Sequence, residues 1–263
     1  MNLILLSFIM TCAIQAFAAS VVQKPAYPPV IADSNDQRAR AEHEWRRMLD
    51  FYHVPQTPPD FYPSTHLPRS LLGVLDGIKI LNAQPQSGAG DIALLEGVKG
   101  FIDRWRDLIG ADLASISLVS AVKADGARRI TYREAVYPFP IAGGYGVLTV
   151  LLTEDGRLIQ LDDRFIPLVS IPTGPSIDRE TAARKQIGRT FSYRDVSGAT
   201  QQVRINDASD LAVKQLVVLP IEKGKGLESH LAWVIIGGKS QSWLVYVDAV
   251  NGEELRSIQN FET

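Results

Sequence analysis

The sequence predicts an α+β fold made of two tandem units, each a helix followed by antiparallel strands, behind a helical N-terminal segment. Three observations support this prediction. Apolar residues recur at helical spacing in residues 33–53 and 91–110, and strand-like runs separated by turn residues fill residues 115–163. The same order of helix and strands returns after residue 175. The two units share this order of elements but no obvious sequence repeat.

The first 18 residues have the features of a secretory signal. Leu3 to Ala16 form an apolar stretch too short to cross a bilayer, and Ala16-Phe17-Ala18 matches the small-x-small pattern of a cleavage site. We therefore expect cleavage after Ala18 and a secreted or periplasmic protein. Cys12, the only cysteine, would leave with the signal, so the mature chain would form no disulfide and no thiolate metal site. No second apolar run is long enough to anchor the chain in a membrane.

The charge balance argues against a nucleic-acid partner. The formal net charge is -2 and the pI is near 6.1. The densest group of basic residues is interleaved with glutamates on one predicted helix, which indicates a solvated face: Arg38, Arg40, Glu42, Glu44, Arg46 and Arg47.

Residues 19–67 contain a Pro-rich lead, a helix and a linker. The lead, KPAYPPV, favours extended backbone. The helix is predicted from Asp33 to His53 because apolar residues recur at spacings of four, three and four: Ala41, Trp45, Met48 and Tyr52. The linker, Val54 to Pro68, interrupts it. The sequence does not indicate where this segment packs.

The first unit spans residues 68–170. Its helix is expected to begin at Asp91, a candidate N-cap, and to end at Gly110, a candidate C-cap. Apolar residues at a three-four repeat lie between them: Leu95, Val98, Ile102, Trp105 and Ile109. Four predicted strands follow: SISLVSAV (115–122), RRITYREAVY (128–137), GVLTVLLT (146–153) and RLIQLDD (157–163). GVLTVLLT is apolar on both faces, so we expect it to be central in the sheet and covered by the helix on one side.

The second unit spans residues 171–263 and repeats this order. Asp178 is its candidate N-cap, Glu180 lies where the helix dipole favours an anion, and a short helix continues to Ile187. Five predicted strands follow: QQVRI (201–205), AVKQLVVLPI (212–221), LAWVII (231–236), WLVYVDA (243–249) and EELRSI (253–258). Trp233 and Trp243 are expected to face the helix as core residues.

Two short motifs imitate functional sites. GGKS (237–240) lacks the upstream glycine of a phosphate-binding loop, because Trp233 stands there, and a strand rather than a helix follows it. We predict a hairpin loop. HEWRR (43–47) has Arg47 where a zinc-protease helix needs its second histidine, so His43 and Glu44 are predicted to be surface residues. The four histidines, at positions 43, 53, 66 and 230, show no metal-ligand spacing.

With these elements placed, two family resemblances become visible. Leu231-Ala-Trp, a strand, a turn and then WLVYVDAVNGEEL resemble the end of a PepSY domain, and SIDRETAARKQI resembles the helix that opens such domains. Upstream, ARRITYREAVYPFPIAGGYGVLTVLLTEDGRLIQLDD resembles the fungalysin/thermolysin-type propeptide (FTP) domain, with Glu134 where that family usually has Gln and Pro140-Ile141 in place of Pro-Val. Together the resemblances cover roughly residues 68–258. They imply two tandem cystatin-like domains, FTP-like over 68–170 and PepSY-like over 171–263.

The resemblance implies a propeptide, the part of a secreted zinc endopeptidase precursor that assists folding and inhibits the enzyme. No peptidase domain follows in these 263 residues. We therefore expect a stand-alone, non-enzymatic protein without cofactor or metal, which binds and inhibits or modulates a thermolysin-like metallopeptidase in trans. The alternative is a non-catalytic binding or assembly module of the cell envelope that uses the PepSY sheet. A hydrolase with an unrecognised site is the third hypothesis.

Two local expectations concern the C-terminal region. Asp248 should accept backbone hydrogen bonds that close the turn at Asn251-Gly252, where positive φ is favourable; a metal-ligand role for Asp248 is the alternative, although no second carboxylate is placed to help. The tail is the predicted partner contact. Phe261 would occupy a hydrophobic pocket of the peptidase, with Glu262 and the carboxylate of Thr263 beside it.

Overall fold

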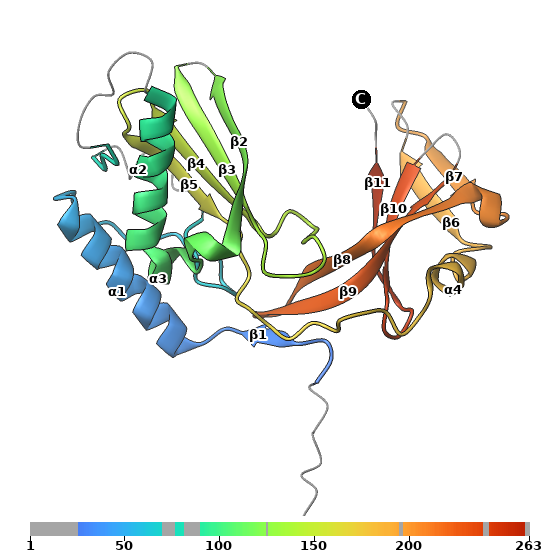
Figure 1. Ribbon diagram of the computed structural model, residues 1–263. Helices are drawn as coiled ribbons and strands as arrows, with labels where there is room; N and C mark the ends of the chain where they lie inside the picture. Colours follow the sequence, from blue (N-terminus) through green and yellow to red (C-terminus); the bar gives the residue numbers. More distant parts are fainter. Residues whose placement is uncertain are drawn as a thin grey trace, which may run out of the picture.

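The computed structural model describes residues 26–69, 77–81, 90–124, 126–194, 197–238 and 242–260. The chain forms two lobes (Figure 1), and the structure confirms the α+β class. The first lobe contains helices α1 to α3 and strands β2 to β5. The second contains α4 and the remaining strands, β1 and β6 to β11. The predicted signal and the predicted partner contact, Phe261 to Thr263, lie outside the described residues.

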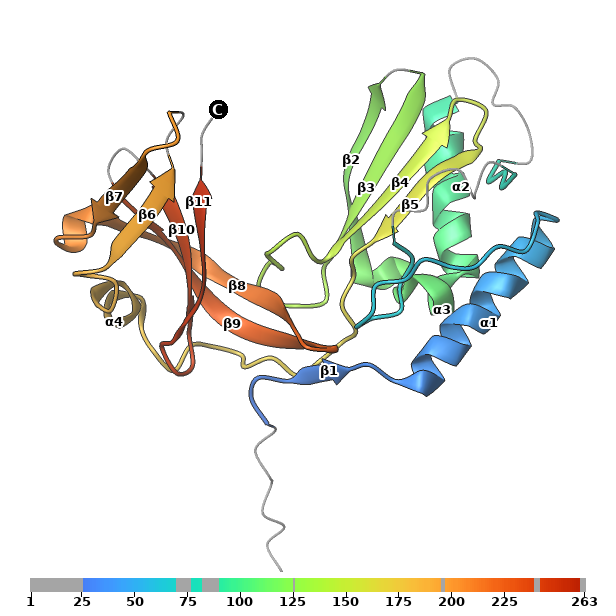
Figure 2. The same ribbon diagram turned by 180° about the vertical axis from the view of Figure 1, so that it is seen from behind.

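The first lobe is an antiparallel sheet covered by helices on one face. Its strands lie in the order β2 (Ile116–Ala124), β3 (Ala127–Glu134), β4 (Val147–Thr153) and β5 (Leu158–Asp163). As predicted, β4 is central, and Leu148, Val150 and Leu152 alternate toward the helices α2 (Gly90–Arg104) and α3 (Arg106–Ile109). In Figure 2 the sheet lies in front of α2, and no described helix covers its other face.

The N-terminal helix completes this lobe. α1 (Asn35–Phe51) buries Trp45, Met48 and Leu49 in the same apolar cluster as α2 and the sheet. The indole Nε1 of Trp45 donates to the carbonyl of Thr57 at 2.8 Å, and its ring meets Phe61 edge to face. The linker after α1 therefore folds back over the helix.

The second lobe is built from two sheets and one helix. The larger sheet has the order β1 (Val30–Ala32), β9 (Gly226–Gly237), β10 (Ser242–Asp248) and β11 (Glu254–Asn260), with β8 (Leu211–Lys223) also paired to β9. β6 (Thr190–Arg194) and β7 (Thr200–Arg204) form a separate pair. Two short 3-10 helices lie at Leu113–Ser115 in the first lobe and Ala208–Asp210 in the second.

One face of the large sheet packs against α4 (Arg179–Arg184) and the β6–β7 pair. Trp243 is buried and stacks on Phe191, with ring centroids 4.8 Å apart. Trp233 is partly buried beside it and donates from Nε1 to the carbonyl of Ile177 at 2.8 Å. Both tryptophans lie on the helix side of the sheet, as expected.

Three chain segments join the lobes. β1 comes from the N-terminal segment and pairs with residues 226–228 of β9 before the chain enters α1. Residues of the 137–145 loop of the first lobe reach β8, where Ile141 forms a parallel bridge with Val218. The linker after β5 buries Ile166 against Ile31 and Leu227. Residues 26–67, the described part of a segment whose position the sequence left open, thus contribute to both lobes.

Several sequence predictions need correction. Asp91 lies inside α2 rather than at its N-cap, and the predicted single helix is interrupted at Trp105, although Gly110 does end α3 with a φ of 73°. β1 and β6 were not predicted. Positive φ at the last turn falls on Gly252, at 77°; Asn251 is not among the described residues with positive φ. A Cβ at position 252 would lie 2.7 Å from Cδ1 of Ile177, so packing also favours glycine there.

Candidate functional site

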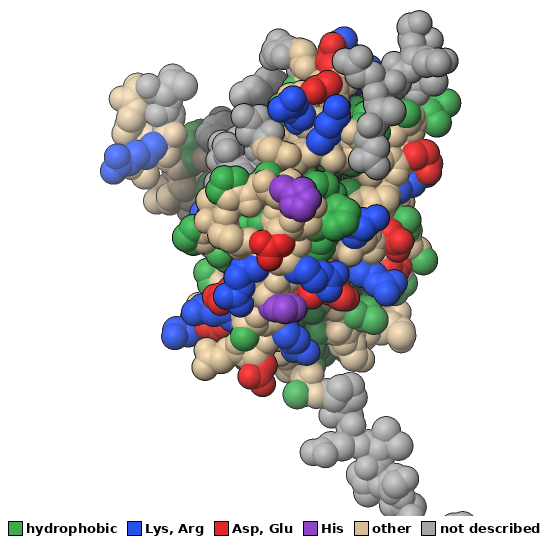
Figure 3. Space-filling view, turned by 90° about the vertical axis from the view of Figure 1, so that its left-hand side faces the viewer, with side chains coloured by type: hydrophobic (Ala, Val, Ile, Leu, Met, Phe, Trp, Pro, Cys, Tyr) green, Lys and Arg blue, Asp and Glu red, His purple; other side chains and the backbone are tan. Residues whose placement is uncertain are grey.

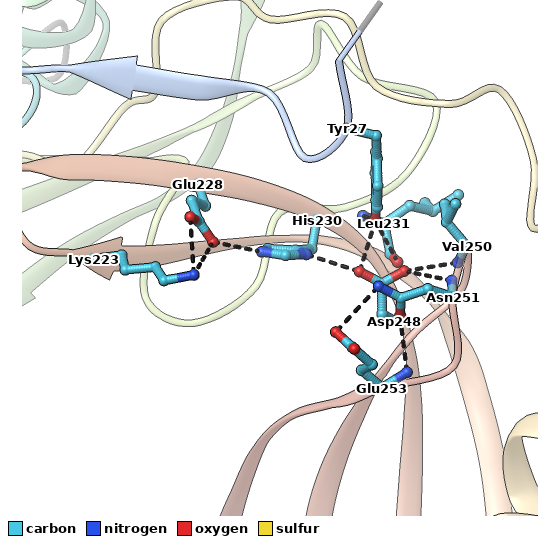
Figure 4. A network of polar contacts seen from close by, with 9 residues as sticks. All are labelled: Tyr27, Lys223, Glu228, His230, Leu231, Asp248, Val250, Asn251 and Glu253. Atoms are coloured by element: carbon cyan, nitrogen blue, oxygen red, sulfur yellow. Dashed lines mark hydrogen bonds and ion pairs between the residues drawn. The ribbon is translucent and has the colours of Figure 1, made fainter.

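A polar network lies where β9 and β10 meet the N-terminal segment, and Asp248 is its centre (Figure 4). Asp248 is fully buried. Its Oδ1 accepts hydrogen bonds from the backbone N–H groups of Val250 at 2.7 Å and Asn251 at 3.2 Å. Its Oδ2 accepts from the Tyr27 hydroxyl at 3.0 Å and lies 2.8 Å from Nδ1 of His230. The predicted turn closure by Asp248 is therefore confirmed.

These contacts occupy the hydrogen-bond acceptor sites of the Asp248 carboxylate. An ionised carboxylate offers about four lone-pair sites, and four donors surround this one. Burial raises the pKa of Asp248, but the hydrogen bonds from His230, Val250, Asn251 and Tyr27 outweigh it, so the pKa lies below its usual value. The ionised form is stabilised by the protein itself, and no lone pair is left for a metal ion.

Tyr27 fills a gap in the hydrogen-bond ladder of β9. β1 pairs with residues 226–228 of this strand and β10 with residues 232–237, so Leu231 lies between the two partners. The Leu231 N–H donates to the Tyr27 hydroxyl at 3.0 Å, and that hydroxyl donates to Asp248. Burial, reinforced by the charge of Asp248, raises the pKa of Tyr27, so the hydroxyl keeps its proton at neutral pH. One side chain thus joins the N-terminal segment to both strands.

The network continues from His230 toward solvent. Its Nε2 lies 3.3 Å from Oε2 of Glu228, whose Oε1 lies 3.2 Å from Nζ of Lys223 (Figure 4). The imidazole therefore bridges two carboxylates, and with both nitrogens protonated it would donate to each. No serine or threonine hydroxyl is bonded to this imidazole in the described part of the chain. The network joins β9, β10 and the N-terminal segment.

A second acidic group lies where the first lobe joins the linker. Glu134, at the end of β3, accepts a hydrogen bond from the Ile166 N–H at 3.1 Å, and Asp163, at the end of β5, accepts from the Phe165 N–H at 3.0 Å. Burial raises the pKa of Glu134 to about 7. The fully buried Asp163 has its pKa raised well above the usual value, mainly by burial and further by the charge of Glu134. The pair anchors the linker between the two lobes.

A cleft of about 800 Å³ opens on the helical side of the first lobe. Figure 3 shows this side of the molecule, where basic and acidic side chains are interleaved. Arg40, His43 and Arg106 line the cleft together with Asp107, and the buried His66 lies at its wall with Nε2 3.0 Å from Oδ1 of Asp33. The volume is in the range of small-molecule sites, but the mixed charges select no single ligand class.

Two strands leave an edge without a strand partner among the described residues, on the facing sides of the lobes. β2 pairs there only with β3, and β11 only with β10. Both views of the ribbon place β2 as the strand of the first lobe nearest the second, and β11 on the side of its lobe that faces β2 (Figures 1 and 2). On β2, the apolar residues Leu118, Val119 and Val122 are exposed by 46%, 50% and 53%.

The two motifs that imitate functional sites lie on helix α1 and in the loop after β9. His43 is exposed, as predicted, but Glu44 is not a surface residue: its side chain is only 13% exposed and forms an ion pair with Arg47 at 3.1 Å. In the described part of the chain no three His, Cys, Asp or Glu residues are grouped as a metal site would need. No described helix has the length and apolar character to cross a membrane. Lys239 and Ser240 of the GGKS loop lie outside the described residues.

The partners of Asp248 could not be identified from the sequence. Tyr27 lies 221 positions away from it in the chain. Glu228 and His230 lie two positions apart on one face of β9, which is a weak sequence signal for a polar site. The predicted strand began at Leu231 and therefore did not include either residue.

Comparisons with known proteins add little. No family model matches the chain, and no curated protein matches it either. Among solved structures, the chain is similar to the C-terminal domain of YpeB from Bacillus megaterium, with 15% identity, a TM-score of 0.35, and coverage of 87% of this chain and 98% of that one. A TM-score of 0.35 reflects a partial likeness, which by itself says nothing about function.

Proposed function

We propose that this protein is a non-catalytic, extracytoplasmic binding protein of the propeptide type, which binds a thermolysin-like zinc endopeptidase in trans and inhibits or modulates it. The observation that supports this proposal best is the pair of open strand edges, on β2 and β11, on facing sides of a two-lobed frame. Exposed strand edges bind extended segments of other proteins by strand addition. The frame thus offers a partner two places for such contacts.

The sequence resemblances supply the identity of the proposed partner. The segments that resemble FTP and PepSY domains coincide with the β3–β5 meander and with β9 to β11. In this chain two of the motif residues have structural roles: Asp248 accepts a hydrogen bond that closes the last turn, and Trp233 packs beside α4. Because these motif residues hold the sheets together, the proposed partner would bind the outer surfaces of the two lobes.

The lobes are joined in a way that suits a binding frame. β1 on β9, the Ile141 bridge to β8 and the buried Ile166 restrict the junction at three separate places. A pre-organised surface loses less conformational entropy when it binds. The two lobes would therefore present the β2 and β11 edges to a partner without changing their arrangement.

The experiment is an inhibition assay in trans. Protein comprising residues 19–263 is titrated against a thermolysin-like zinc endopeptidase exported by the same cells, and peptide hydrolysis and complex formation are measured together. We expect dose-dependent inhibition and a stable complex, with no effect on a serine endopeptidase used as a control. Absence of both binding and inhibition would overturn the proposal, and recovery of the protein with an envelope component instead would favour the assembly-module alternative.

The predicted tail contact needs its own variant. Asn260 is the last residue of β11, so a chain ending at Asn260 removes Phe261 to Thr263 without shortening the strand. If the tail contributes, this variant inhibits less than the intact protein. Equal potency would remove the tail from the mechanism and leave the strand edges as the contact.

A further inference from the structure

We propose that the free edge of β2 binds an extended segment with apolar side chains on one face and acidic side chains on the other, which joins the first-lobe sheet as a fifth strand. This inference deepens the proposed function and rests on it for the identity of the protein that carries the segment. The chemistry of the segment comes from the side chains around β2.

The edge is long and accessible. β2 has nine residues and a partner on one side only, so the groups on its other side have no strand partner in the described part of the chain. Three of its apolar residues, Leu118, Val119 and Val122, are about half exposed. Such an edge is a template for another strand, which is why proteins usually protect it.

The uncovered face of the sheet carries positive charge next to this edge. Across β2 and β3, Arg133 lies opposite Ser117 and Arg129 lies opposite Val122, with Thr131 opposite Ser120 between them. Both arginines are exposed, and neither forms an ion pair with a described carboxylate. Strands are about 4.8 Å apart, so the guanidinium of Arg133 can reach the edge past Ser117, whereas that of Arg129 has to pass the half-exposed Val122. A strand added beyond β2 would therefore bring alternate side chains close to two unpaired cations.

The helix-covered face beside the same edge is apolar and incompletely filled. Leu118 and Ala121 lie on this face of β2, opposite Tyr132 and Ile130. A hollow of about 30 Å³ lies there between the sheet and α2, lined by Asp91, Leu94, Leu95, Ala121, Arg128 and Ile130. The side chains of an added strand that point to this face would lie beside Leu118 and Ala121, so small apolar residues fit there, although Arg128 and Asp91 form an ion pair at the same hollow.

Two features restrict what can pair with the edge. A β-bulge at Val119 interrupts the register between Leu118 and Ser120, and Lys123 stands near the end of the strand. Bulges and lysines are common guards of strand edges. Here Lys123 is paired with Glu154, and its charge is thereby offset. The bulge therefore limits which strands can pair with this edge. Arg129 and Arg133, which form no ion pair with a described carboxylate, favour an acidic strand.

The test uses synthetic strand probes and the intact protein. The first nonapeptide alternates valine with glutamate, and the second alternates valine with lysine. Binding to residues 19–263 is measured by fluorescence anisotropy, and protection of β2 amides by hydrogen exchange. We expect the acidic peptide to bind about tenfold more tightly, the order of magnitude for two partly exposed ion pairs, and to protect amides of residues 116–124.

A charge-reversal variant tests the role of the arginines. Arg129→Glu with Arg133→Glu should reverse the preference between the two peptides. The matched control, Arg40→Glu with Arg46→Glu on the exposed face of α1, should leave it unchanged. Equal binding of both peptides by the wild-type protein, or an unchanged preference in the β2-side variant, would overturn the inference.

The same variant separates this inference from the proposed function. If the wild-type protein inhibits the peptidase and the Arg129→Glu, Arg133→Glu variant inhibits equally well, the peptidase binds elsewhere and the β2 inference fails while the proposed function stands. If the acidic peptide binds as expected but no peptidase is bound or inhibited, the β2 inference stands and the proposed function fails.

Discussion

The two lobes reach a folded state by different means. In the first, helices α1 to α3 cover one face of a four-stranded sheet, and the buried residues form one continuous apolar cluster from Trp45 to Phe165. In the second, α4 has six residues, and the buried apolar residues divide into separate clusters on the two faces of the large sheet and at the junction. Hydrogen bonds around Asp248 join the strands and the N-terminal segment there.

This difference predicts which substitutions should destabilise each lobe most. A lobe with one large core loses stability mainly when a cavity is opened in it. A lobe with several small cores and a buried polar network loses stability when removal of one member of that network leaves the others unsatisfied. Four substitutions test this contrast between the lobes.

Trp45→Ala should open a cavity in the first-lobe core. Trp45 is completely buried and donates a hydrogen bond to Thr57. We expect a loss of about 4 kcal/mol in the free energy of unfolding, as is usual when a large aromatic residue is removed from a core. Urea denaturation measures it. Arg46→Ala, at the next and exposed position, is the control and should change stability by less than about 0.5 kcal/mol; a similar loss in both variants would contradict the cavity mechanism.

Asp248→Ala should destabilise the second lobe by about 3 kcal/mol, because it leaves four donors, one buried and three partly buried, without their acceptor. Asp248→Asn keeps one acceptor oxygen for the turn and should lose less. Urea denaturation followed by tryptophan fluorescence, which includes Trp243, provides the measurement. If Asp248→Ala is as stable as the wild-type protein, packing alone holds this lobe and the contrast between the lobes disappears.

Tyr27→Phe should cost about 1–3 kcal/mol, the range for leaving a buried N–H group without its partner. The ring remains, but the Leu231 N–H and the Asp248 carboxylate lose the hydroxyl between them. Hydrogen exchange should become faster at Leu231. The control is Tyr193→Phe, whose hydroxyl has no hydrogen bond among those described, and exchange at Leu231 should not change there. Unchanged exchange in Tyr27→Phe would show that this contact does not hold the segment.

Glu134→Gln should change how stability depends on pH. Because the pKa of Glu134 is raised to about 7 from a usual 4.5, the folded state binds this proton more tightly than the unfolded state does. Its contribution is therefore fully present below pH 4.5 and is lost as the pH rises toward about 7. The substituted amide does not titrate, which removes this dependence, while its oxygen can still accept from the Ile166 N–H. Denaturation midpoints across this pH range should fall less in the variant.

The interpretation of that experiment depends on the two other shifted carboxyl groups. Asp163 is shifted in the same direction as Glu134, so part of the loss on raising the pH will remain in the variant. Asp248 is shifted in the opposite direction, and its contribution is lost only as the pH falls below its usual range. Identical pH profiles for wild-type protein and Glu134→Gln would contradict the assigned role of Glu134.

The α+β class and most of the strands could be predicted from the sequence, because both depend on local periodicity. The strand GVLTVLLT, apolar on both faces, was expected at the centre of its sheet and lies there as β4. Local chemistry also predicted the C-cap at Gly110 and the turn closed by Asp248, since each needs only residues close in the chain.

How distant segments meet could not be predicted from local sequence. The three residues of β1 have no periodicity to show that they join β9, about 195 positions away, and Tyr27 has no local signal that it completes a ladder around Leu231. Glu134 was noticed only as a departure from a family pattern; its raised pKa arises from burial, which the linker provides when Ile166 enters the junction. Pairing between segments far apart in the chain depends on which surfaces remain unsatisfied after local folding, and that is a property of the whole molecule.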